Sequence, residues 1–379
     1  MRAIVTGQIG MDKKPYLDAA AKFAGQQGEA LAMYHVGDLM YKEGPDVRPG
    51  KILDLPISRL NSLRRAAFKD IISGSREQKN MLVNTHATFR WRHGLFAAFD
   101  YDQIAAIKPD LFICLVDNIE VVHHRLHEDH DIDATLKDCM VWREEEILAT
   151  ELMSKAIPGS QFYILSRGRH QTTVKTLFRL ICRPGMRKVY PSFPMSHVMD
   201  MPDVLAEIDA FRAALAEHFI TFDPGDVDEK LLLDRSIAAA KDGKDWLEVA
   251  PHQFGGAVPS RSEGVPKPIR VRVREVLDIA GDVDGQIYMR DFKLVDQSDM
   301  IVSYIPELPG GVPGLSSGVE RELHHAFEHT KEVFVVWKPK KAPSPFITET
   351  ATRIFKSTEE ALKYFEDNGY FGEKNLFGN

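Results

Sequence analysis

The chain has 379 residues, which is enough for two domains of ordinary size. Apolar residues make up 44% and charged residues 27%, a composition typical of globular proteins, and a net charge of −7 excludes a broad basic surface for nucleic acids or anionic membranes. Three widely separated cysteines, Cys114, Cys139 and Cys182, argue against a disulfide framework and fit a reducing cytoplasm. No apolar run reaches the ~18 residues of a membrane span, and the N-terminus lacks a secretion signal. We therefore expect a cytoplasmic protein.

In the first half of the chain, short apolar runs alternate with helical patterns. Strands are expected at 2–7, 80–89, 109–117 and 160–166, and helices at 14–28, 121–130 and 142–157. This alternation predicts βαβ units around a parallel sheet.

The pattern restarts near residue 186, after a turn signal. We expect a strand there, a helix at 201–219, a strand at 220–224, a long loop within 246–268, a helix and then a strand within 290–307, a strand at 331–339, and a helix at 357–370 capped by Ser357. The predicted fold class is therefore α/β, with two three-layer domains of mainly parallel sheets, residues 1–183 and 187–379.

A glycine-containing loop follows the first expected strand and precedes the first expected helix. Its sequence is GQIGMDKK, and Gly7, Gly10 and Lys13 fit the phosphate-binding pattern G-x-x-x-x-G-K-[ST]. Asp12 stands where the last glycine is expected, and Lys14 replaces the hydroxyl residue that binds Mg²⁺. Because strand–glycine–helix turns are common in α/β proteins, the loop alone leaves an ordinary turn open.

Further segments join this loop, in particular NTHATFRW and KPDLFICLVDNIEVVHHRL. Together they resemble the archaeal-type adenylate kinases, which are P-loop nucleoside monophosphate kinases, over roughly residues 1–170. The resemblance implies that Lys13 holds nucleotide phosphates, that Arg90 and Arg92 contact phosphates near the acceptor, and that ATP with Mg²⁺ is the ligand of this domain.

Two departures from that family affect the metal. Asn84 takes the place of the family's aspartate, and Lys14 takes the place of its Mg²⁺ ligand. Phosphoryl transfer depends on positioning and on metal and cationic charge. We therefore expect this domain to bind a nucleotide without turning it over, while an active kinase and a structural relic remain alternatives.

The stretch SSGVEREL, residues 316–323, opens a helix in the second half. Ser317 and Glu320 form the S-x-x-E pattern of a capping box, and Val319 and Leu323 lie on one helical face. Glu322 lies at the edge of that face and is not explained by the cap. It is either an ordinary flanking carboxylate or a catalytic one.

The segments KVYPSFPMSHV, IYMRDFKLVDQSDMIVSYIPE and SSGVERELHHAFEHTKEVFVVWKP occur in this order. They resemble the nucleoside 2-deoxyribosyltransferase superfamily, most closely its deoxynucleoside 5′-monophosphate N-glycosidases. In that pattern an R-D pair, here Arg290-Asp291, precedes a helix and an apolar strand at 300–305. A loop then delivers S-x-G-x-x-x-E.

The resemblance implies a role for each matching residue. Glu322 would be the nucleophile, and Asp291 would position or protonate the departing base, although a helix N-cap is an alternative for Asp291. Phe193 stands where the family has glycine, which alters the pocket. The remaining candidates are substrate-binding residues: Ser316, Ser317 and Gly318 for a 5′-phosphate, Tyr288 for the sugar or base (or for the core), and Ser192 and His197 for the pocket wall.

The sequence therefore predicts a nucleotide-processing protein: a C-terminal N-glycosidase or deoxyribosyltransferase joined to an N-terminal nucleotide-binding domain. No metal ligand set and no cofactor for the glycosidase are expected. The partners are nucleotides or nucleosides, without membrane or sequence-specific nucleic acid, and the resemblance implies a homo-oligomer. The alternatives are an active nucleoside monophosphate kinase with a non-catalytic C-terminal domain and a nucleotide sensor without turnover.

Overall fold

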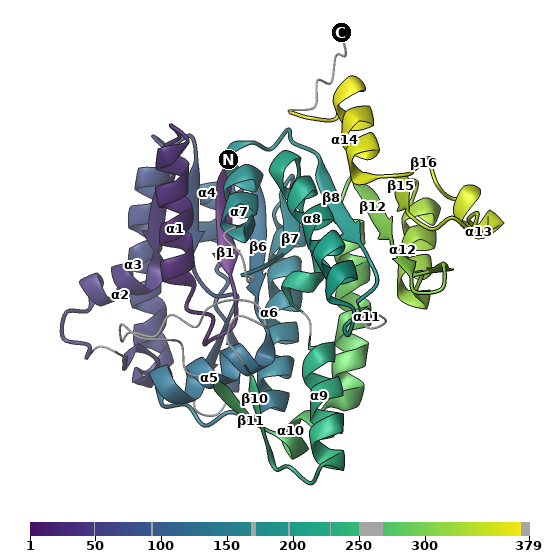
Figure 1. The fold of residues 1–379 in the computed structure, drawn as a ribbon. Helices are drawn as coiled ribbons and strands as arrows, with labels where there is room; N and C mark the ends of the chain where they lie inside the picture. The colour runs from purple at the N-terminus through teal and green to yellow at the C-terminus, as the bar shows by residue number, and fades with distance from the viewer. Residues whose placement is uncertain are drawn as a thin grey trace. The chain divides into compact units, whose positions relative to one another are not determined.

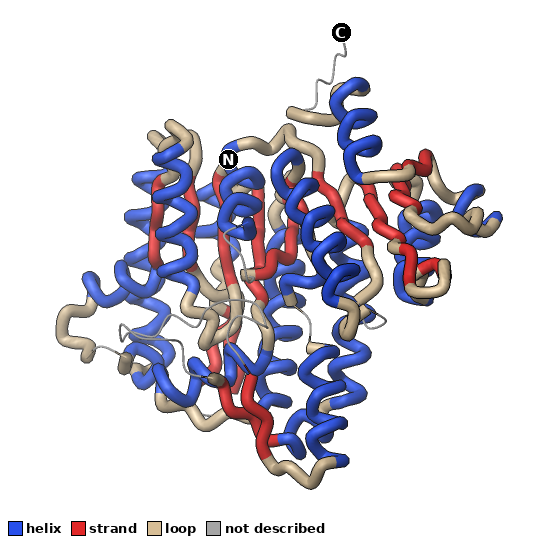
Figure 2. Tube along the Cα trace, viewed as in Figure 1, coloured by secondary structure: helices blue, strands red, loops and turns tan. Residues whose placement is uncertain are grey.

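The computed structural model describes residues 1–48, 50–91, 94–167, 172–195, 198–227, 229–249 and 268–372. The chain forms two compact units, unit 1 (residues 1–182) and unit 2 (residues 183–379). Each unit contains a five-stranded sheet flanked by helices (Figures 1 and 2). Both of these sheets are parallel throughout, which confirms the predicted α/β class.

The sheet of unit 1 has the strand order β2-β3-β1-β6-β7. The central strand β1 pairs with β3 on one side and with β6 on the other, so the loop that follows β1 leaves from the middle of the carboxyl edge. That is where the glycine-containing loop lies. The strands are β1 (Arg2–Thr6), β2 (Ala32–His35), β3 (Met81–Asn84), β6 (Leu111–Val116) and β7 (Gln161–Ser166).

Helices cover both sides of this sheet (Figure 1). On one side, Ile4, Val83 and Phe112 join a buried cluster with residues of α3, α4 and α6. Elsewhere α1 packs against α7, where the rings of Phe23 and Phe178 meet edge to face at 5.3 Å. The helices are α1 (Lys13–Gln26), α2 (Val36–Glu43), the 3₁₀ turn η1 (Ile52–Asp54), α3 (Ile57–Ser75), α4 (Tyr101–Ile107), α5 (Ile119–His130), α6 (Leu136–Ala156) and α7 (Thr172–Cys182).

Two expectations for unit 1 were wrong in detail. The strand expected at 80–89 is broken, because the chain leaves the sheet after β3 and forms a separate antiparallel hairpin of β4 (Thr88–Trp91) and β5 (Gly94–Ala97). The helix expected at 142–157 begins earlier. Thr135 caps α6 by accepting a hydrogen bond from the Asp138 N–H, while the Asp138 side chain bonds back to the Thr135 N–H, which is a capping box.

The sheet of unit 2 has the order β16-β15-β12-β8-β9. The first strand, β8, lies between β9 and β12, so the chain turns in opposite directions from β8 and β12. In open parallel sheets, such a switch point leaves a crevice at the carboxyl ends where ligands bind. The strands are β8 (Lys188–Ser192), β9 (Ile220–Thr221), β12 (Met300–Ile305), β15 (Glu332–Trp337) and β16 (Arg353–Phe355).

The two faces of this sheet are covered differently. Val189, Val302 and Phe334 pack with α8 and α14 on one face. Tyr190 and Ser192 alternate with Val189 and therefore point to the other face, toward α11 and α12. The helices are α8 (Pro202–His218), the 3₁₀ turn η2 (Pro224–Asp226), α9 (Lys230–Lys241), α10 (Val273–Asp278), α11 (Ala280–Asp296), α12 (Ser317–Glu328), α13 (Pro345–Thr348) and α14 (Thr358–Asp367).

Two short hairpins complete unit 2. The segment expected as a long loop contributes β10 (Trp246–Val249), which pairs with β11 (Ile269–Arg272), while residues 250–267 lie outside the described part of the chain. The hairpin of β13 (Glu307–Leu308) and β14 (Val312–Pro313) lies in the loop between β12 and α12.

The structure confirms one of the helix starts predicted for unit 2 and corrects two others. Ser357 caps α14 as predicted, with its Oγ accepting a bond from the Glu360 N–H at 3.2 Å. Ser316, rather than Ser317, caps α12 and accepts from the Val319 N–H at 3.2 Å. Asp291 is not an N-cap, and the R-D pair does not precede its helix. α11 already starts at Ala280, so the pair lies in its last third.

Within the described residues, the helices all fall short of the length and apolarity that crossing a bilayer requires.

Candidate functional site

The carboxylate of Glu322 lies at the switch point of unit 2. Glu322 is half-buried on α12, and its Oε1 accepts a hydrogen bond of 2.8 Å from the Tyr190 hydroxyl. Its Oε2 accepts a bond of 2.5 Å from Ser192 Oγ. Both donors come from β8, so the strand and the helix together fix the orientation of the carboxylate. Neither donor is a cation, so the carboxylate is oriented without being neutralised.

These surroundings change the acidity of the carboxyl group. Burial, and next the charge of the nearby Asp291 carboxylate, raises the pKa of Glu322 to about 8, against the opposite effect of the two hydroxyl donors. Burial, and then the charge of Glu322, also raises the pKa of Tyr190 well above its usual value, so the phenol stays protonated and donates. The Glu322–Asp291 pair therefore holds one proton near neutral pH.

Arg290 is a structural neighbour of this pair. Its buried guanidinium lies 3.2 Å from Glu229 and also donates to the Val227 carbonyl, whereas the distance from its Nε to Asp291 Oδ1 is 3.9 Å. The stronger ion pair therefore goes to Glu229. Arg290 anchors the end of α11 to the segment before α9, and the Asp291 carboxylate is left with a weaker cationic contact.

More polar groups border the same carboxyl edge. Arg212 pairs with Asp223 at 2.7 Å and lies 5.0 Å over the ring of Phe193, the residue at the family's glycine position. Ser303 on β12 is in register with Ser192 and fully buried, and within the described residues its hydroxyl has no hydrogen-bond partner. An unsatisfied buried hydroxyl beside Ser192 is a group that a ligand can pair with.

The remaining predicted residues of unit 2 are dispersed around this centre. Ser317 and Gly318 are exposed at the first turn of α12, beside the capping Ser316. Tyr288 is 52% exposed on α11, with its ring 4.6 Å from Phe292, so the alternative of a core tyrosine is wrong. His197 lies outside the described residues.

A cavity of about 220 Å³ lies beside α11 in unit 2. Its wall includes Ile287, one helical turn before Asp291, and Met195, three residues after Ser192. Glu322 and Asp291 themselves are not part of its lining. The other lining residues are Met199, Lys230, Leu231, Asp234 and Asp284.

The backbone of the glycine-containing loop of unit 1 lies very close to a side chain of α5. Gly10 has φ +82°, and a Cβ there would lie 2.8 Å from Leu126 Cγ, so only glycine fits. Lys13 Nζ donates to the Gly7 carbonyl at 2.9 Å, and burial lowers its pKa to about 8. Gln8 is 5% exposed, and within the described part of the chain neither of its amide atoms has a hydrogen-bond partner.

Buried arginines surround this loop. Arg125 donates to the Gly10 carbonyl at 3.4 Å and pairs with Asp117 at 3.0 Å, while Arg167 donates to the Met11 carbonyl at 2.8 Å. Burial, together with the charge of Arg125, lowers the pKa of Arg167 to about 10. The local excess of cations suits an anion such as a phosphate.

The residues at the positions that would hold Mg²⁺ make contacts with other protein groups instead. Lys14 is exposed and paired with Asp38, and the Asn84 amide lies 3.0 Å from His35 Nδ1. The buried carboxylate of Glu146 accepts bonds from the N–H groups of Gly7 and Ala87, at 3.2 and 2.8 Å. These residues do not fit a magnesium ion at the loop.

The predicted acceptor-side arginines lie on the hairpin of unit 1. Arg90 pairs with Glu145, and its guanidinium lies 4.7 Å over the ring of Trp142; burial lowers its pKa. Arg92 lies outside the described residues. Arg90 is thus held by α6, and no contact among the described residues directs it at the loop.

Comparisons with known proteins concern mainly the first unit. The family model of the AAA domain matches residues 7–139. Adenylate kinase of Pyrococcus furiosus is 28% identical over 140 residues, which cover 34% of this chain and 68% of that protein. Unit 1 is accordingly a P-loop domain of the kinase-like kind.

Similarity to solved structures is low. Shikimate kinase from Bacteroides thetaiotaomicron is 13% identical, with a TM-score of 0.33, over 48% of this chain and 97% of its own. A siderophore periplasmic binding protein from Thermobifida fusca is 13% identical, with a TM-score of 0.17, over 96% of this chain and 95% of its own. Neither likeness supports a structural argument.

Sequence analysis missed several residues that the structure brings to the two sites. Tyr190 is two residues before Ser192 in a buried strand, and two hydroxyls at that spacing share one face, which was the available signal. Glu146 and Arg167 carried no such signal, because their partners are distant in the sequence. Gln8 carried none either, because its burial is evident only in the structure.

Proposed function

We propose that unit 2 is an N-glycosidase or deoxyribosyltransferase that cleaves the base–sugar bond of a nucleotide-like substrate, with Glu322 as its nucleophile. The observation that carries this proposal is the Glu322 carboxylate at the switch point, oriented by the hydroxyls of Tyr190 and Ser192 and coupled to Asp291. The arrangement agrees with the roles that the sequence resemblance implies.

The pair supplies both groups that the reaction needs. Cleavage of a base–sugar bond passes through an oxocarbenium-like transition state, which a carboxylate can capture as a glycosyl ester. The single proton of the pair moves from Glu322 to Asp291, and Asp291 donates it to the departing base as the C–N bond breaks. Glu322 then bonds to the anomeric carbon. Water or the N–H of a second base then attacks the anomeric carbon, gives its proton to Asp291, and displaces the Glu322 carboxylate, which restores the one-proton pair.

The start of α12 would hold the substrate's anionic end. Ser317 and Gly318 are exposed at this helix N-terminus, where backbone N–H groups and the helix dipole favour a phosphate. Ser316 Oγ is engaged by the Val319 N–H, so it positions the helix, and Ser317 is the hydroxyl left for the phosphate.

The test of this function is a panel of nucleotides and deoxynucleotides, assayed for released base by chromatography. We expect at least one to be cleaved, and Glu322→Ala to lower the rate by on the order of 10³-fold or more, since the covalent route is lost. Glu320→Gln is the matched control, because Glu320 is an exposed carboxylate on the same helix and should leave the rate unchanged.

Two results would contradict this assignment. One is the absence of base release from every nucleotide, with or without ATP. The other is base release that survives Glu322→Ala, because the reaction would then use another residue.

For unit 1 the function favoured is nucleotide binding without phosphoryl transfer. Three features of the loop suit the phosphates of a nucleotide. The Gln8 amide has no hydrogen-bond partner among the described residues, and the backbone at Gly10 leaves no room for a side chain. The cations of Lys13, Arg125 and Arg167 are buried there. The poor fit to Mg²⁺ removes the ion on which transfer depends.

An active nucleoside monophosphate kinase is the second candidate, favoured by the similarity to adenylate kinase. Magnesium-dependent phosphate transfer that survives Glu322→Gln but is lost in Lys13→Ala would establish it. A nucleotide sensor is the third, and tight binding without turnover by either unit would point to it.

A further inference from the structure

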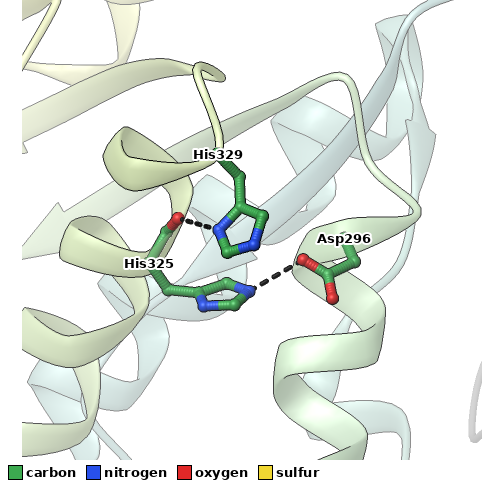
Figure 3. Close-up of side chains that lie close together, drawn as sticks. All are labelled: Asp296, His325 and His329. Carbon is green, nitrogen blue, oxygen red and sulfur yellow. Dashed lines mark hydrogen bonds and ion pairs between the residues drawn. The ribbon is translucent and has the colours of Figure 1, made fainter.

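Three side chains at one end of unit 2 bring their ligand atoms together, away from the carboxylate pair. Asp296 is the last residue of α11, while His325 and His329 lie at the end of α12. One oxygen and two ring nitrogens lie within 4.8 Å of one another. Figure 3 shows the two imidazoles side by side near the carboxylate, with His325 Nε2 at 2.7 Å from Asp296 Oδ1.

Existing contacts orient both imidazoles. His329 Nδ1 lies 2.8 Å from the His325 carbonyl oxygen, and because a carbonyl can only accept, Nδ1 must carry the hydrogen. This fixes the tautomer and leaves Nε2 as the bare nitrogen that can bind a metal. The ring of His325 lies 4.6 Å from the ring of Phe292 and 4.1 Å from the ring of His329, tilted by 39° to the latter.

The local charge favours a cation. The carboxyl ends of α11 and α12 meet at this cluster, and the C-terminal ends of helices carry partial negative charge. Lys331 directs its ammonium to the backbone carbonyls of Asp296 and Ser298, at 2.9 and 2.6 Å. The Asp296 carboxylate itself remains engaged with His325.

We propose that Asp296, His325 and His329 bind one divalent transition-metal ion of the zinc class. Two imidazole nitrogens and one carboxylate oxygen are a ligand set that suits Zn²⁺ and disfavours Mg²⁺ or Ca²⁺, which prefer oxygen ligands. Metal–ligand bonds of about 2.0–2.2 Å require the carboxylate oxygen and the two imidazole nitrogens to move to within roughly 3.3 Å of one another. The hydrogen on His325 Nε2 moves to Nδ1, and the metal replaces the hydrogen bond to Asp296.

Binding would join the two helices that carry the carboxylate pair. α11 holds Asp291 and α12 holds Glu322, and the metal would link their C-terminal ends. Three protein ligands leave the fourth position of a tetrahedral ion to solvent. The proposal stands on these contacts alone and does not depend on the function proposed for unit 2.

The experiment uses the full chain, freed of metal by dialysis against a chelator and titrated with Zn²⁺ in competition with a chromogenic chelator at pH 7.5. We expect one equivalent to bind, and His325→Gln and Asp296→Asn each to weaken binding by about tenfold or more. Co²⁺ should give a visible d–d spectrum that both variants lose.

His324→Gln is the matched control. His324 is the adjacent exposed histidine of α12 and pairs with Glu328 at 3.4 Å, outside the cluster, so it should keep full affinity. Circular dichroism checks that each variant folds. If His325→Gln does not fold, Asp296→Asn, which changes an exposed helix end, provides the test. The proposal is overturned if the chain does not retain one equivalent of Zn²⁺, or if Asp296→Asn binds Zn²⁺ with unchanged affinity.

Discussion

The carboxyl group of Glu322 experiences opposing influences from its neighbours. Burial and the Asp291 charge disfavour its ionised form, while the hydroxyls of Tyr190 and Ser192 favour it. The reaction proposed here needs the proton to leave Glu322 before the carboxylate attacks. The hydroxyl donors are therefore positioning residues that determine how readily this proton leaves.

A prediction at this scale concerns Tyr190→Phe. Loss of one hydrogen bond to a charged group costs about 1.5–3 kcal/mol, which corresponds to a pKa rise of roughly one to two units. The pKa of Glu322 should therefore rise above about 8, and the alkaline limb of the kcat–pH profile for base release, where the pair loses its single proton, should move to higher pH.

Tyr304→Phe serves as the control for this measurement. Tyr304 lies on the opposite face of the sheet and bonds to Glu207, so the limb should stay in place. A limb that moves to lower pH in Tyr190→Phe, or does not move, would show that the phenol does not stabilise the ionised carboxylate.

At the scale of elements, the start of α12 places a helix cap beside the residues proposed to bind the substrate. The cap is Ser316, and the following residues, Ser317 and Gly318, are exposed. The capping-box pattern S-x-x-E located the helix start within one residue but selected the wrong serine, because only Ser317 has a glutamate three residues later, whereas the cap that forms at Ser316 does not use one.

We expect Ser316→Ala to lower the free energy of unfolding of unit 2 by about 1 kcal/mol, the usual cost of losing an N-cap. Ser317→Ala should change it by less than about 0.5 kcal/mol, as at other exposed sites, but should raise KM for a phosphorylated substrate. Urea denaturation followed by tryptophan fluorescence, to which the buried Trp337 contributes, measures the first effect. Equal destabilisation by both variants would contradict the assignment of the cap.

At the scale of the whole molecule, two units with separate cores present two different sites. The described core of unit 1 surrounds the strands beside the glycine-containing loop, and that of unit 2 surrounds the sheet below the carboxylate pair. A ligand that binds only one unit should therefore stabilise that unit by mass action.

ATP without magnesium should raise the melting temperature of the unit 1 transition, by an amount equivalent to about 2.7 kcal/mol at a hundredfold excess over Kd. Lys13→Ala should abolish this shift in differential scanning calorimetry, because its buried ammonium is lost from the loop. Lys14→Ala is the matched control, since the structure pairs Lys14 with Asp38. A shift that persists in Lys13→Ala would place the nucleotide elsewhere.

The sequence by itself determined the α/β class and the approximate position of most elements. It also selected Glu322 and the loop of Gly7, Gly10 and Lys13. Most of these features are local, because apolar periodicity and glycines between a strand and a helix can be recognised within a few residues. Glu322 was selected by the resemblance of several segments, since the local pattern left an ordinary flanking carboxylate open.

Only the tertiary structure decided which groups meet. The strand order of each sheet, the hydroxyls that orient Glu322, the burial that raises its pKa, and the cluster at the ends of α11 and α12 all join residues far apart in the chain. The physical reason is that desolvation and hydrogen bonding act through space, so a residue's chemistry depends on packing that its sequence neighbours do not specify.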